Sequence, residues 1–350
     1  MAVRGPDPVF WRGRRVLVTG HTGFKGSWLT WWLREMGSDV HGVSLAELPS
    51  SPSLWDRLAP VGVTESRTNI AGEAWQEQAR AFAPEIVLHL AAQPLVSTGY
   101  AQPRTTFATN VLGTANVLDL VTTLPAVQAC VVVTSDKVYD VRQAAPYSES
   151  AFFGGKDPYS ASKAAAELVV ASWPTRLAVA TARAGNVIGG GDWADDRLLP
   201  DLVRAWAAGD EVVLRMPSAV RPWQHVVEPL AGYLLYAEEL ARGADLPRGL
   251  NFGPDRAQAV AVREVVEFAA GEWRRFVPGS SAGWRVEGRP DLRETEVLTL
   301  DSTAAADVLG WHGRWDWRAA ISRSLAWYAE ERRGADPRDL VAADLGAYLS

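Results

Sequence analysis

The sequence predicts an α/β protein in which a doubly wound parallel sheet is accompanied by a smaller C-terminal lobe. From Val16 onward, short β-branched segments alternate with longer segments of helical period, a pattern typical of parallel strands covered by helices on both faces. A glycine-rich turn joins the first strand to the first helix, at the sheet edge where such folds bind ligands. After about residue 187 the pattern loosens into loops rich in Pro, Trp and Gly, which indicates the second lobe.

Four apolar segments are predicted to be strands, with helices between them. The strands are VLVTG (16–20), DVHGVSL (39–45), PEIVLHLAA (84–92) and VQACVVVTS (127–135). One helix is predicted over FKGSWLTWWLREMG (24–37), and another continues to about residue 123. Trp28, Trp31 and Trp32 stand at i, i+3 and i+4, so we expect them to form the core face of the first helix. Cys130 lies in a β-branched run and is predicted to be a small core residue.

Composition limits the class of function. The chain has 350 residues, 47% of them hydrophobic, so it can bury a large core. A formal net charge of −6, without a long basic block, gives no argument for a nucleic-acid or membrane-surface partner. A single cysteine, no apolar signal core at the start and no long uncharged apolar stretch lead us to expect a cytoplasmic location. The five histidines lack metal-binding spacing, so no metal site is expected.

The glycine-rich turn reads G-x-x-G-x-x-G and predicts a dinucleotide site. Its glycines let the backbone approach a pyrophosphate, and the helix N-terminus offers unpaired N–H groups. The alternative is an ordinary glycine-rich turn. No acidic residue that would bind the adenosine ribose is evident, because Ala46 stands where an Asp is expected. Lys25 or His21 could instead bind the 2′-phosphate of NADP. NAD and NADP therefore both stay open. The predicted cofactor residues of the turn are Gly20, His21, Gly23, Phe24, Lys25 and Gly26.

A second motif, DPYSASK, opens a predicted helix with Pro158 in its first turn. Tyr159 and Lys163 are four residues apart, so both side chains project from one helical face. An ammonium beside a phenol stabilises the phenolate, which can take a hydroxyl proton while hydride leaves the same carbon. Thr134 or Ser135 can supply a hydroxyl that aligns the phenol or a sugar. A half-exposed tyrosine and a solvated lysine are the alternative, but the glycine turn favours the catalytic interpretation.

These motifs together resemble the extended short-chain dehydrogenase/reductase superfamily, and within it the CDP-glucose 4,6-dehydratase family. The resemblance covers nearly the whole chain and rests on FWRGRRVLVTGHTGFKGSWL, HLAAQPLV, TNVLGT, TSDKVYD, DPYSASK, RAGNVIGGGDWADDRLLPD, RPWQHVVEPLAGY and NFGP. It implies a Rossmann domain that holds NAD and a smaller lobe for a nucleotide-sugar. We expect residues 1–187 to form the Rossmann domain, with returns near 226–256 and 301–310, and residues 188–350 mainly to form the other lobe.

Asp136 and Lys137 directly follow a predicted strand. The resemblance implies that this pair supplies the acid and base for dehydration. In a 4,6-dehydratase, oxidation at C4 makes the C5 proton acidic, a base removes it, an acid protonates the departing C6 hydroxyl, and hydride returns to C6. The resemblance implies Asp136 as acid and Lys137 as base. With usual pKa values of about 3.9 and 10.4, the neutral pair costs roughly 9 kcal/mol relative to the ion pair in water, so burial must offset most of this. The opposite assignment and a plain surface salt bridge both stay open.

The resemblance also indicates the remaining contacts and partners. Ala91 and Ala92 are expected along the cofactor. A homodimer through helices near residues 99–123 and 158–173 is expected from kinship. Two other functions stay open: a dehydratase or epimerase of another nucleotide-sugar, and a non-catalytic dinucleotide sensor. The predicted substrate-binding residues are Gln93, Asn186, Arg197 and Arg221, of which the arginines match diphosphate oxygens.

Overall fold

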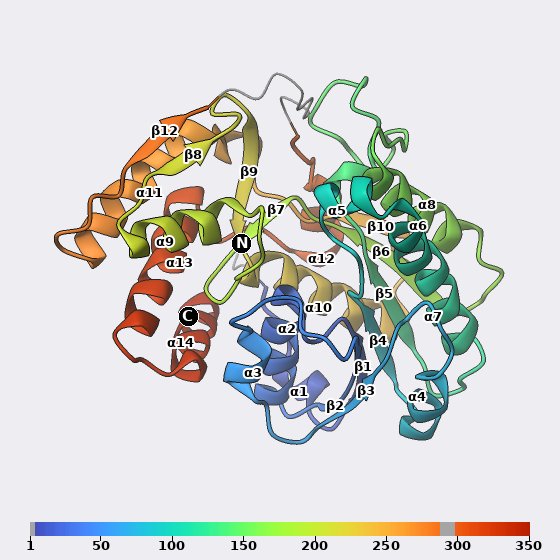
Figure 1. Ribbon diagram of the computed structural model, residues 1–350. Coiled ribbons are helices and arrows are strands. Elements are labelled where there is room, and N and C mark those ends of the chain that lie inside the picture. Colours follow the sequence, from blue (N-terminus) through green and yellow to red (C-terminus); the bar gives the residue numbers. More distant parts are fainter. Residues whose placement is uncertain (1–3, 288–297) are drawn as a thin grey trace.

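The computed structural model describes residues 4–287 and 298–350, and its centre is a seven-stranded parallel sheet (Figure 1). The strand order is β10-β6-β5-β4-β1-β2-β3, so the direction of winding reverses between β1 and β4. Ligands bind at such a switch point in open α/β sheets. The strands are β1 (Arg15–Thr19), β2 (Asp39–Ser44), β3 (Val63–Arg67), β4 (Ile86–His89), β5 (Ala129–Val133), β6 (Ala178–Arg183) and β10 (Gly249–Asn251). The predicted doubly wound sheet is therefore confirmed, and the four predicted strands correspond to β1, β2, β4 and β5.

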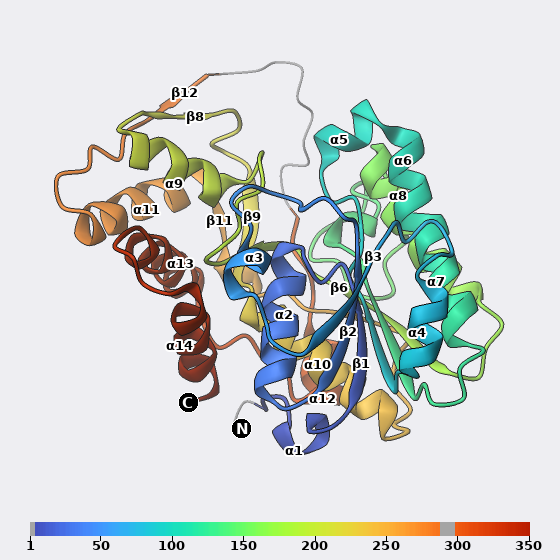
Figure 2. The same ribbon diagram turned by 60° about the horizontal axis from the view of Figure 1, so that its bottom comes forward.

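Helices cover both faces of the sheet, which explains why its strands are apolar at consecutive positions. Val16 and Val18 of β1 face one core cluster, whereas Leu17 between them faces the other. Cys130 of β5 is fully buried in the second cluster, as predicted. Figure 2 shows the two helical layers on either side of the strands. One layer contains α2 (Phe24–Glu35), α10 (Val227–Ala241) and α12 (Thr303–Leu309), and the other contains α4 (Gln76–Phe82), α7 (Gly113–Val121) and α8 (Pro158–Ser172).

The tryptophans of α2 lie on the core side of the helix. Trp28 and Trp32 are buried, and Trp31 is partly buried against the same cluster, so the predicted core face is confirmed. The Trp28 indole N–H donates to the carbonyl of Gly190 at 3.0 Å. This bond joins α2, which packs on the sheet, to the loop around Gly190 in the second lobe.

The helix predicted to run to about residue 123 is broken. It consists of α5 (Val96–Ala101), α6 (Pro103–Phe107), a π-helical turn (Ala108–Leu112) and α7. The break lies at Gln102, whose φ of −137° and ψ of 63° are not helical. A residue that precedes proline is disfavoured in the helical region, because the proline ring crowds its backbone. Pro103 then begins the next helix, where its missing N–H is not needed.

A second lobe lies beside the sheet, at the upper left of Figure 1. Its core is continuous with that of the sheet, because one cluster of buried residues runs from α2 to the C-terminal helices. Within the described residues, no helix is both long and apolar enough to cross a membrane. The strands of the second lobe are β7 (Asn186–Ile188), β8 (Val212–Leu214), β9 (Val220–His225), β11 (Ala259–Ala261) and β12 (Trp284–Val286). Its helices are α9 (Leu198–Ala208), α11 (Val262–Phe276), α13 (Trp317–Arg332) and α14 (Pro337–Leu349). The remaining short helices are α1 (Pro8–Trp11) and α3 (Leu54–Leu58).

The substitution Gly190→Ala is expected to lower the free energy of unfolding by about 1 to 3 kcal/mol, the usual cost of overpacking a filled core. A Cβ atom at Gly190 would lie 2.0 Å from the ring of Trp327. Gly271→Ala is the matched control, because nothing lies within 4 Å of its added Cβ and Ala stabilises a helix by about 0.5 to 1 kcal/mol over Gly. Urea unfolding followed by tryptophan fluorescence measures both. Unchanged stability of Gly190→Ala would contradict the close packing.

Candidate active site

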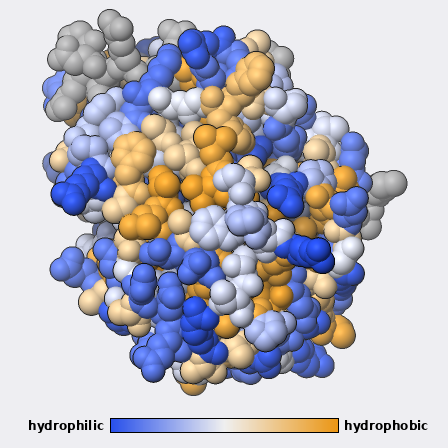
Figure 3. All heavy atoms as spheres, turned by 90° about the vertical axis from the view of Figure 1, so that its right-hand side faces the viewer, coloured by the Kyte–Doolittle hydropathy of each residue, from blue (hydrophilic) through white to orange (hydrophobic). Residues whose placement is uncertain are grey.

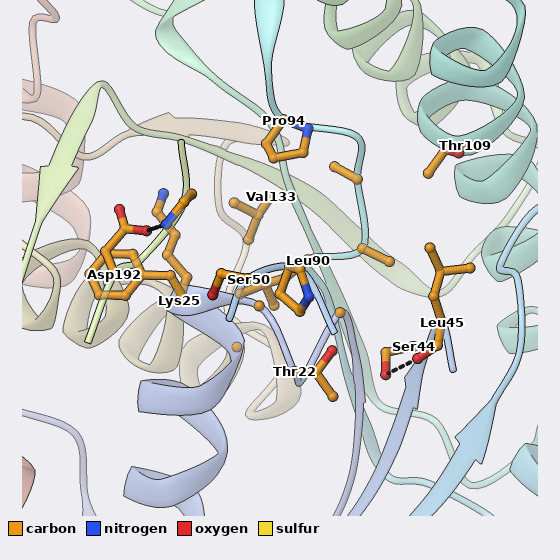
Figure 4. Close-up of a pocket in the computed structure, with 18 of the residues that line it drawn as sticks. Thr22, Lys25, Ser44, Leu45, Ser50, Leu90, Pro94, Thr109, Val133 and Asp192 are labelled. Atoms are coloured by element: carbon orange, nitrogen blue, oxygen red, sulfur yellow. Dashed lines mark hydrogen bonds between the residues drawn. The ribbon is translucent and has the colours of Figure 1, made fainter. Parts of the chain in front are cut away.

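A cavity of about 400 Å³ lies at the carboxyl edge of the sheet, where the winding reverses. A volume of this order is typical of cofactor and ligand pockets. Figure 4 shows residues from the glycine turn and from the ends of several strands around one space. The predicted site residues that line this cavity are Gly20, Gly23, Phe24, Lys25, Gly26, Ala91, Ala92, Ser135, Tyr159, Lys163 and Arg197.

The glycine turn is close-packed on its inner side, which makes glycine necessary at two positions. A Cβ atom at Gly20, where φ is +75°, would lie 2.6 Å from the backbone nitrogen of Ala91. A Cβ atom at Gly26 would lie 2.1 Å from the carbonyl oxygen of Gly20. Gly23 begins α2 without a side-chain cap, so no side chain occupies the N–H groups at this helix end. The turn therefore fits a pyrophosphate, which accepts hydrogen bonds from such groups.

His21 is the one residue of the predicted cofactor turn that is not among the residues lining the cavity. Its ring lies over Gly42 of β2, where an added Cβ would come within 2.5 Å of it, and it contacts Trp55 edge-on. Its Nε2 is 2.5 Å from the carboxylate of Glu65 on β3. Burial lowers the pKa of His21, and the Glu65 interaction opposes that shift. The His21 side chain therefore packs against β2 and β3 and does not face the cavity.

Lys25 points toward the catalytic end of the cavity. Its ammonium lies 3.3 Å from the hydroxyl of Tyr233 on α10. Burial, together with the nearby charges of Arg197 and Lys163, lowers the pKa of Lys25 to about 7. Figure 4 places Lys25 on one side of the cavity and Ser44, where β2 ends, on the other. Because the adenosine ribose is expected near the end of β2, the geometry does not support a contact between Lys25 and a 2′-phosphate.

Tyr159 and Lys163 are brought together by α8, as the four-residue spacing predicts. Asp157 caps the helix by accepting from the backbone N–H of Ser160 at 3.0 Å. The ammonium of Lys163 donates to the carbonyl of Val133 at 3.0 Å, and burial lowers the pKa of Lys163 to about 8. Burial raises the pKa of Tyr159, whereas its hydrogen bond with Ser135 lowers it. The phenol and the ammonium therefore share one desolvated site at the end of β5.

Asp136 and Lys137 directly follow Ser135, in a short 3₁₀ turn, and unlike Ser135 they are not among the residues that line the cavity. The Asp136 side chain is 2% exposed, and its Oδ1 accepts from the hydroxyl of Ser135 at 3.1 Å. Its Oδ2 has no hydrogen-bond partner within the described structure and lies against Gly185, where an added Cβ would be 2.9 Å away. The Lys137 ammonium lies 4.0 Å from Asp136 Oδ1, and its side chain is 28% exposed. Since Asp136 is buried, the pair is not a surface salt bridge.

A buried ion pair beneath the site did not follow from the sequence motifs. Glu167 of α8 accepts two hydrogen bonds from Arg183 of β6, at 2.8 and 2.7 Å. The same carboxylate accepts from Thr134, directly before Ser135. The Arg183 guanidinium also donates to the hydroxyl of Tyr139 at 2.8 Å. The four-residue spacing from Lys163 to Glu167 could have indicated that Glu167 lies on the catalytic face of α8, but its partner on β6 has no local signal.

The predicted substrate contacts are only partly brought together. Arg197 lines the cavity, and its buried Nε has no hydrogen-bond partner within residues 4–287 and 298–350. Gln93, Asn186 and Arg221 are not among the lining residues. The Gln93 amide instead donates to the hydroxyl of Thr106 at 2.8 Å and accepts from a backbone N–H, so it orders its own loop. Arg221 is buried on β9 and donates to the carbonyl of Val220 at 2.9 Å. The described residues contain no cluster of three or more metal-ligating side chains.

Comparison with known proteins agrees with this geometry. The chain is 41% identical over 359 residues to CDP-glucose 4,6-dehydratase of Salmonella typhimurium, covering 98% of each chain. It is 27% identical to dTDP-glucose 4,6-dehydratase of Streptomyces antibioticus, covering 92% of this chain and 94% of the relative. The solved structure of MoeE5 in complex with UDP-glucose and NAD superposes with a TM-score of 0.75 at 27% identity, covering 92% of this chain and 100% of that chain.

A family model described as the NAD dependent epimerase/dehydratase family matches residues 16–251, from the first strand of the sheet to the last. The matched segment contains the glycine turn, the Tyr159-Lys163 pair and the Asp136-Lys137 pair. The chain belongs to the NAD-dependent epimerase/dehydratase family, within the short-chain dehydrogenase/reductase superfamily.

Proposed function

We propose that this protein dehydrates CDP-D-glucose to CDP-4-keto-6-deoxy-D-glucose, with NAD as its cofactor. The observation that carries the proposal is a second acid–base pair, Asp136 with Lys137, directly after Ser135, which lines the same cavity as Tyr159 and Lys163. Tyr159 with Lys163 serves the oxidation at C4, and the buried Asp136 with Lys137 serves the elimination of water. An epimerase needs the first pair but not the second. The cytidine nucleotide follows from the similarity to the Salmonella enzyme over 98% of the chain.

The cavity has the donors and the space that NAD requires. The turn from Gly20 to Gly26 and the start of α2 would receive the pyrophosphate, and Ala91 and Ala92 leave room beside it. Glu47 lines the cavity at the end where β2 finishes, where a carboxylate would repel a 2′-phosphate and thus favour NAD over NADP. NAD bound there would supply the acceptor for hydride from C4 of the sugar and the donor for its return to C6.

Each catalytic side chain then has a proton to move or hold. Tyr159 acts as a phenolate, which the charge of Lys163 stabilises, and it takes the proton of the C4 hydroxyl as hydride leaves C4. Lys137 removes the C5 proton, and Asp136 protonates the departing C6 hydroxyl. The unpartnered Oδ2 of Asp136 is available for a substrate hydroxyl. A non-catalytic sensor would have no use for these two pairs in one buried site.

The substrate is held between the two lobes. We assign residues 1–187 mainly to the dinucleotide and residues 188–350 mainly to the nucleotide-sugar, and the latter range includes residues 288–297, outside the described structure. Arg197, at the cavity wall, is placed to meet the diphosphate through its planar guanidinium. Contacts of Gln93, Asn186 and Arg221 with substrate stay predictions.

We also propose a homodimer that buries the face formed by α6, α7 and α8. Figure 3 views this side of the molecule and shows hydrophobic residues gathered across its middle. Phe107 of α6, Leu112 at the end of the π-helical turn before α7, and Leu168 of α8 are at least 40% exposed. Contiguous apolar surface of this kind is costly in water and is typical of protein interfaces. A second copy of the chain would cover it with an identical face.

Purified protein supplied with NAD and CDP-glucose is expected to form a 4-keto-6-deoxy sugar, which develops near-ultraviolet absorbance in alkali. UDP-glucose, GDP-glucose and dTDP-glucose serve as matched substrates that test the base. Product from another nucleotide but not from CDP-glucose would correct the base assignment. Absence of product from all four would overturn the proposed dehydration.

The substitution Lys137→Ala is expected to lower the dehydration rate by about 10²- to 10⁴-fold, the usual contribution of a general base. Oxidation at C4 should survive, because Tyr159 and Lys163 are untouched. The measurement is the transient absorbance of reduced nicotinamide after rapid mixing with substrate, beside the yield of 4-keto product. Lys156→Ala, on the loop before α8, is the control. Undiminished dehydration by Lys137→Ala would refute its role as base.

The substitution Leu112→Arg is expected to convert the dimer into a monomer, because a buried, unpaired guanidinium is strongly disfavoured at an apolar interface. Sedimentation velocity of both proteins measures the change. Val61→Arg is the matched control, since Val61 is 88% exposed in the loop between α3 and β3 and should leave the dimer intact. A wild-type monomer, or a dimer that survives Leu112→Arg, would refute this interface.

A further inference from the structure

The helix α8 is attached to the end of β5 at two points on one of its faces. The ammonium of Lys163 donates to the carbonyl of Val133 at 3.0 Å. Four residues further along α8, the carboxylate of Glu167 accepts from the hydroxyl of Thr134. A helix rises about 1.5 Å per residue, so the two attachments are about 6 Å apart along its axis. A single attachment would let α8 turn or tilt about it, whereas two attachments to consecutive residues fix both its height and its rotation against the strand.

Thr134 joins this attachment to the wall of the cavity. It lines the cavity directly before Ser135, and it is 6% exposed. A hydroxyl has one proton to donate, and that of Thr134 is used in the bond to Glu167, so it is not available for a substrate oxygen. The backbone N–H of Thr134 donates to the carbonyl of Ala182 on β6 at 2.9 Å. Thr134 is therefore bonded to the neighbouring strand through its backbone and to the catalytic helix through its side chain.

The carboxylate of Glu167 has further partners, which hold it in place independently of Thr134. It accepts from the hydroxyl of Thr181 on β6 at 2.7 Å and from the guanidinium of Arg183 at 2.8 and 2.7 Å. If Thr134 lost its hydroxyl, the carboxylate would keep these bonds and its charge would stay paired. Thr181, unlike Thr134, is not among the residues that line the cavity. Two threonine hydroxyls thus donate to one carboxylate, and only one of them lies at the cavity.

We propose that Thr134 is a positioning residue for the oxidation at C4, an inference that rests on the proposed dehydration. By holding Glu167, it fixes α8 against the end of β5 and so sets where Tyr159 and Lys163 stand in the cavity. Tyr159 precedes Lys163 by one turn on the same face of α8, so a rotation or tilt of the helix moves the phenol away from the hydroxyl that it must deprotonate. A displacement of about 1 Å in a reactive group slows catalysis by about 100-fold, so the Thr134 bond controls the rate through Tyr159 and Lys163.

The test compares two substitutions that each remove one hydroxyl from the same carboxylate. Thr134→Val is expected to lower kcat by about 10- to 100-fold and to change KM for CDP-glucose by less than about 2-fold. CDP-glucose deuterated at C4 should show a marked kinetic isotope effect on kcat with this variant, because oxidation then limits turnover. Thr134→Ser, which retains the hydroxyl, should restore kcat. Thr181→Val is the matched control, and it should lower the midpoint of urea unfolding as much as Thr134→Val does but leave kcat close to that of wild type.

The outcomes separate positioning from a purely structural role and from failure of the proposed function. An equal loss of kcat in Thr134→Val and Thr181→Val would show a general effect on stability and would overturn the positioning role. Wild-type kcat in Thr134→Val, a slow variant without the isotope effect, or a slow Thr134→Ser would also overturn it. If Thr134→Val does not fold, Thr134→Ala removes the same hydroxyl with less bulk and carries the same expectations. If wild-type enzyme forms no product from CDP-glucose, the proposed dehydration itself fails, which is a distinct result.

Discussion

The buried ion pair between Glu167 and Arg183 is the interaction on which the arrangement of the catalytic site depends. Through it, α8 is bonded to β6, and through Thr134 the same carboxylate reaches the end of β5. Arg183 extends the connection to Tyr139, whose hydroxyl donates to Asn251 on β10 at 2.7 Å. A buried charge without its partner costs several kcal/mol, so none of these elements can shift alone without a large penalty.

This constraint explains why two catalytic pairs on different elements can work on one sugar. Tyr159 and Lys163 belong to the helix that carries Glu167, whereas Asp136 and Lys137 belong to the loop after the strand that Glu167 also holds. Ser135, which directly precedes Asp136, lines the same cavity as Tyr159 and Lys163. Positioning of this kind avoids the entropic cost of bringing reactive groups together during catalysis.

The electrostatics of the cavity favour anionic groups. Burial lowers the pKa of Lys25, and the charges of Arg197 and Lys163 are close enough to add to this shift by repulsion. A diphosphate or a phenolate placed among these cations would relieve that repulsion. The two lobes also share one core, and the bond from Trp28 to Gly190 joins them beside the cavity. The cofactor end and the substrate end of the site are therefore fixed relative to each other by packing.

Local sequence determined those features that depend on short-range spacing. The alternation of strands and helices, the glycine turn and the shared face of Tyr159 and Lys163 could all be predicted, because backbone geometry fixes which neighbours in sequence are neighbours in space. The same rules could not place His21, whose ring turns under the strand at Gly42 where only glycine leaves room. Nor could they predict that Lys25 reaches Tyr233, because the two are separated by 208 residues.

Tertiary structure alone decided which charged residues are buried and which partners they have. Glu167 with Arg183 and Asp136 against Gly185 are contacts between segments that only the folded sheet brings together. Spacing along one helix or one strand specifies the direction of a side chain but not what lies opposite it. That depends on strand order, which is set by how both faces of the sheet are covered at once.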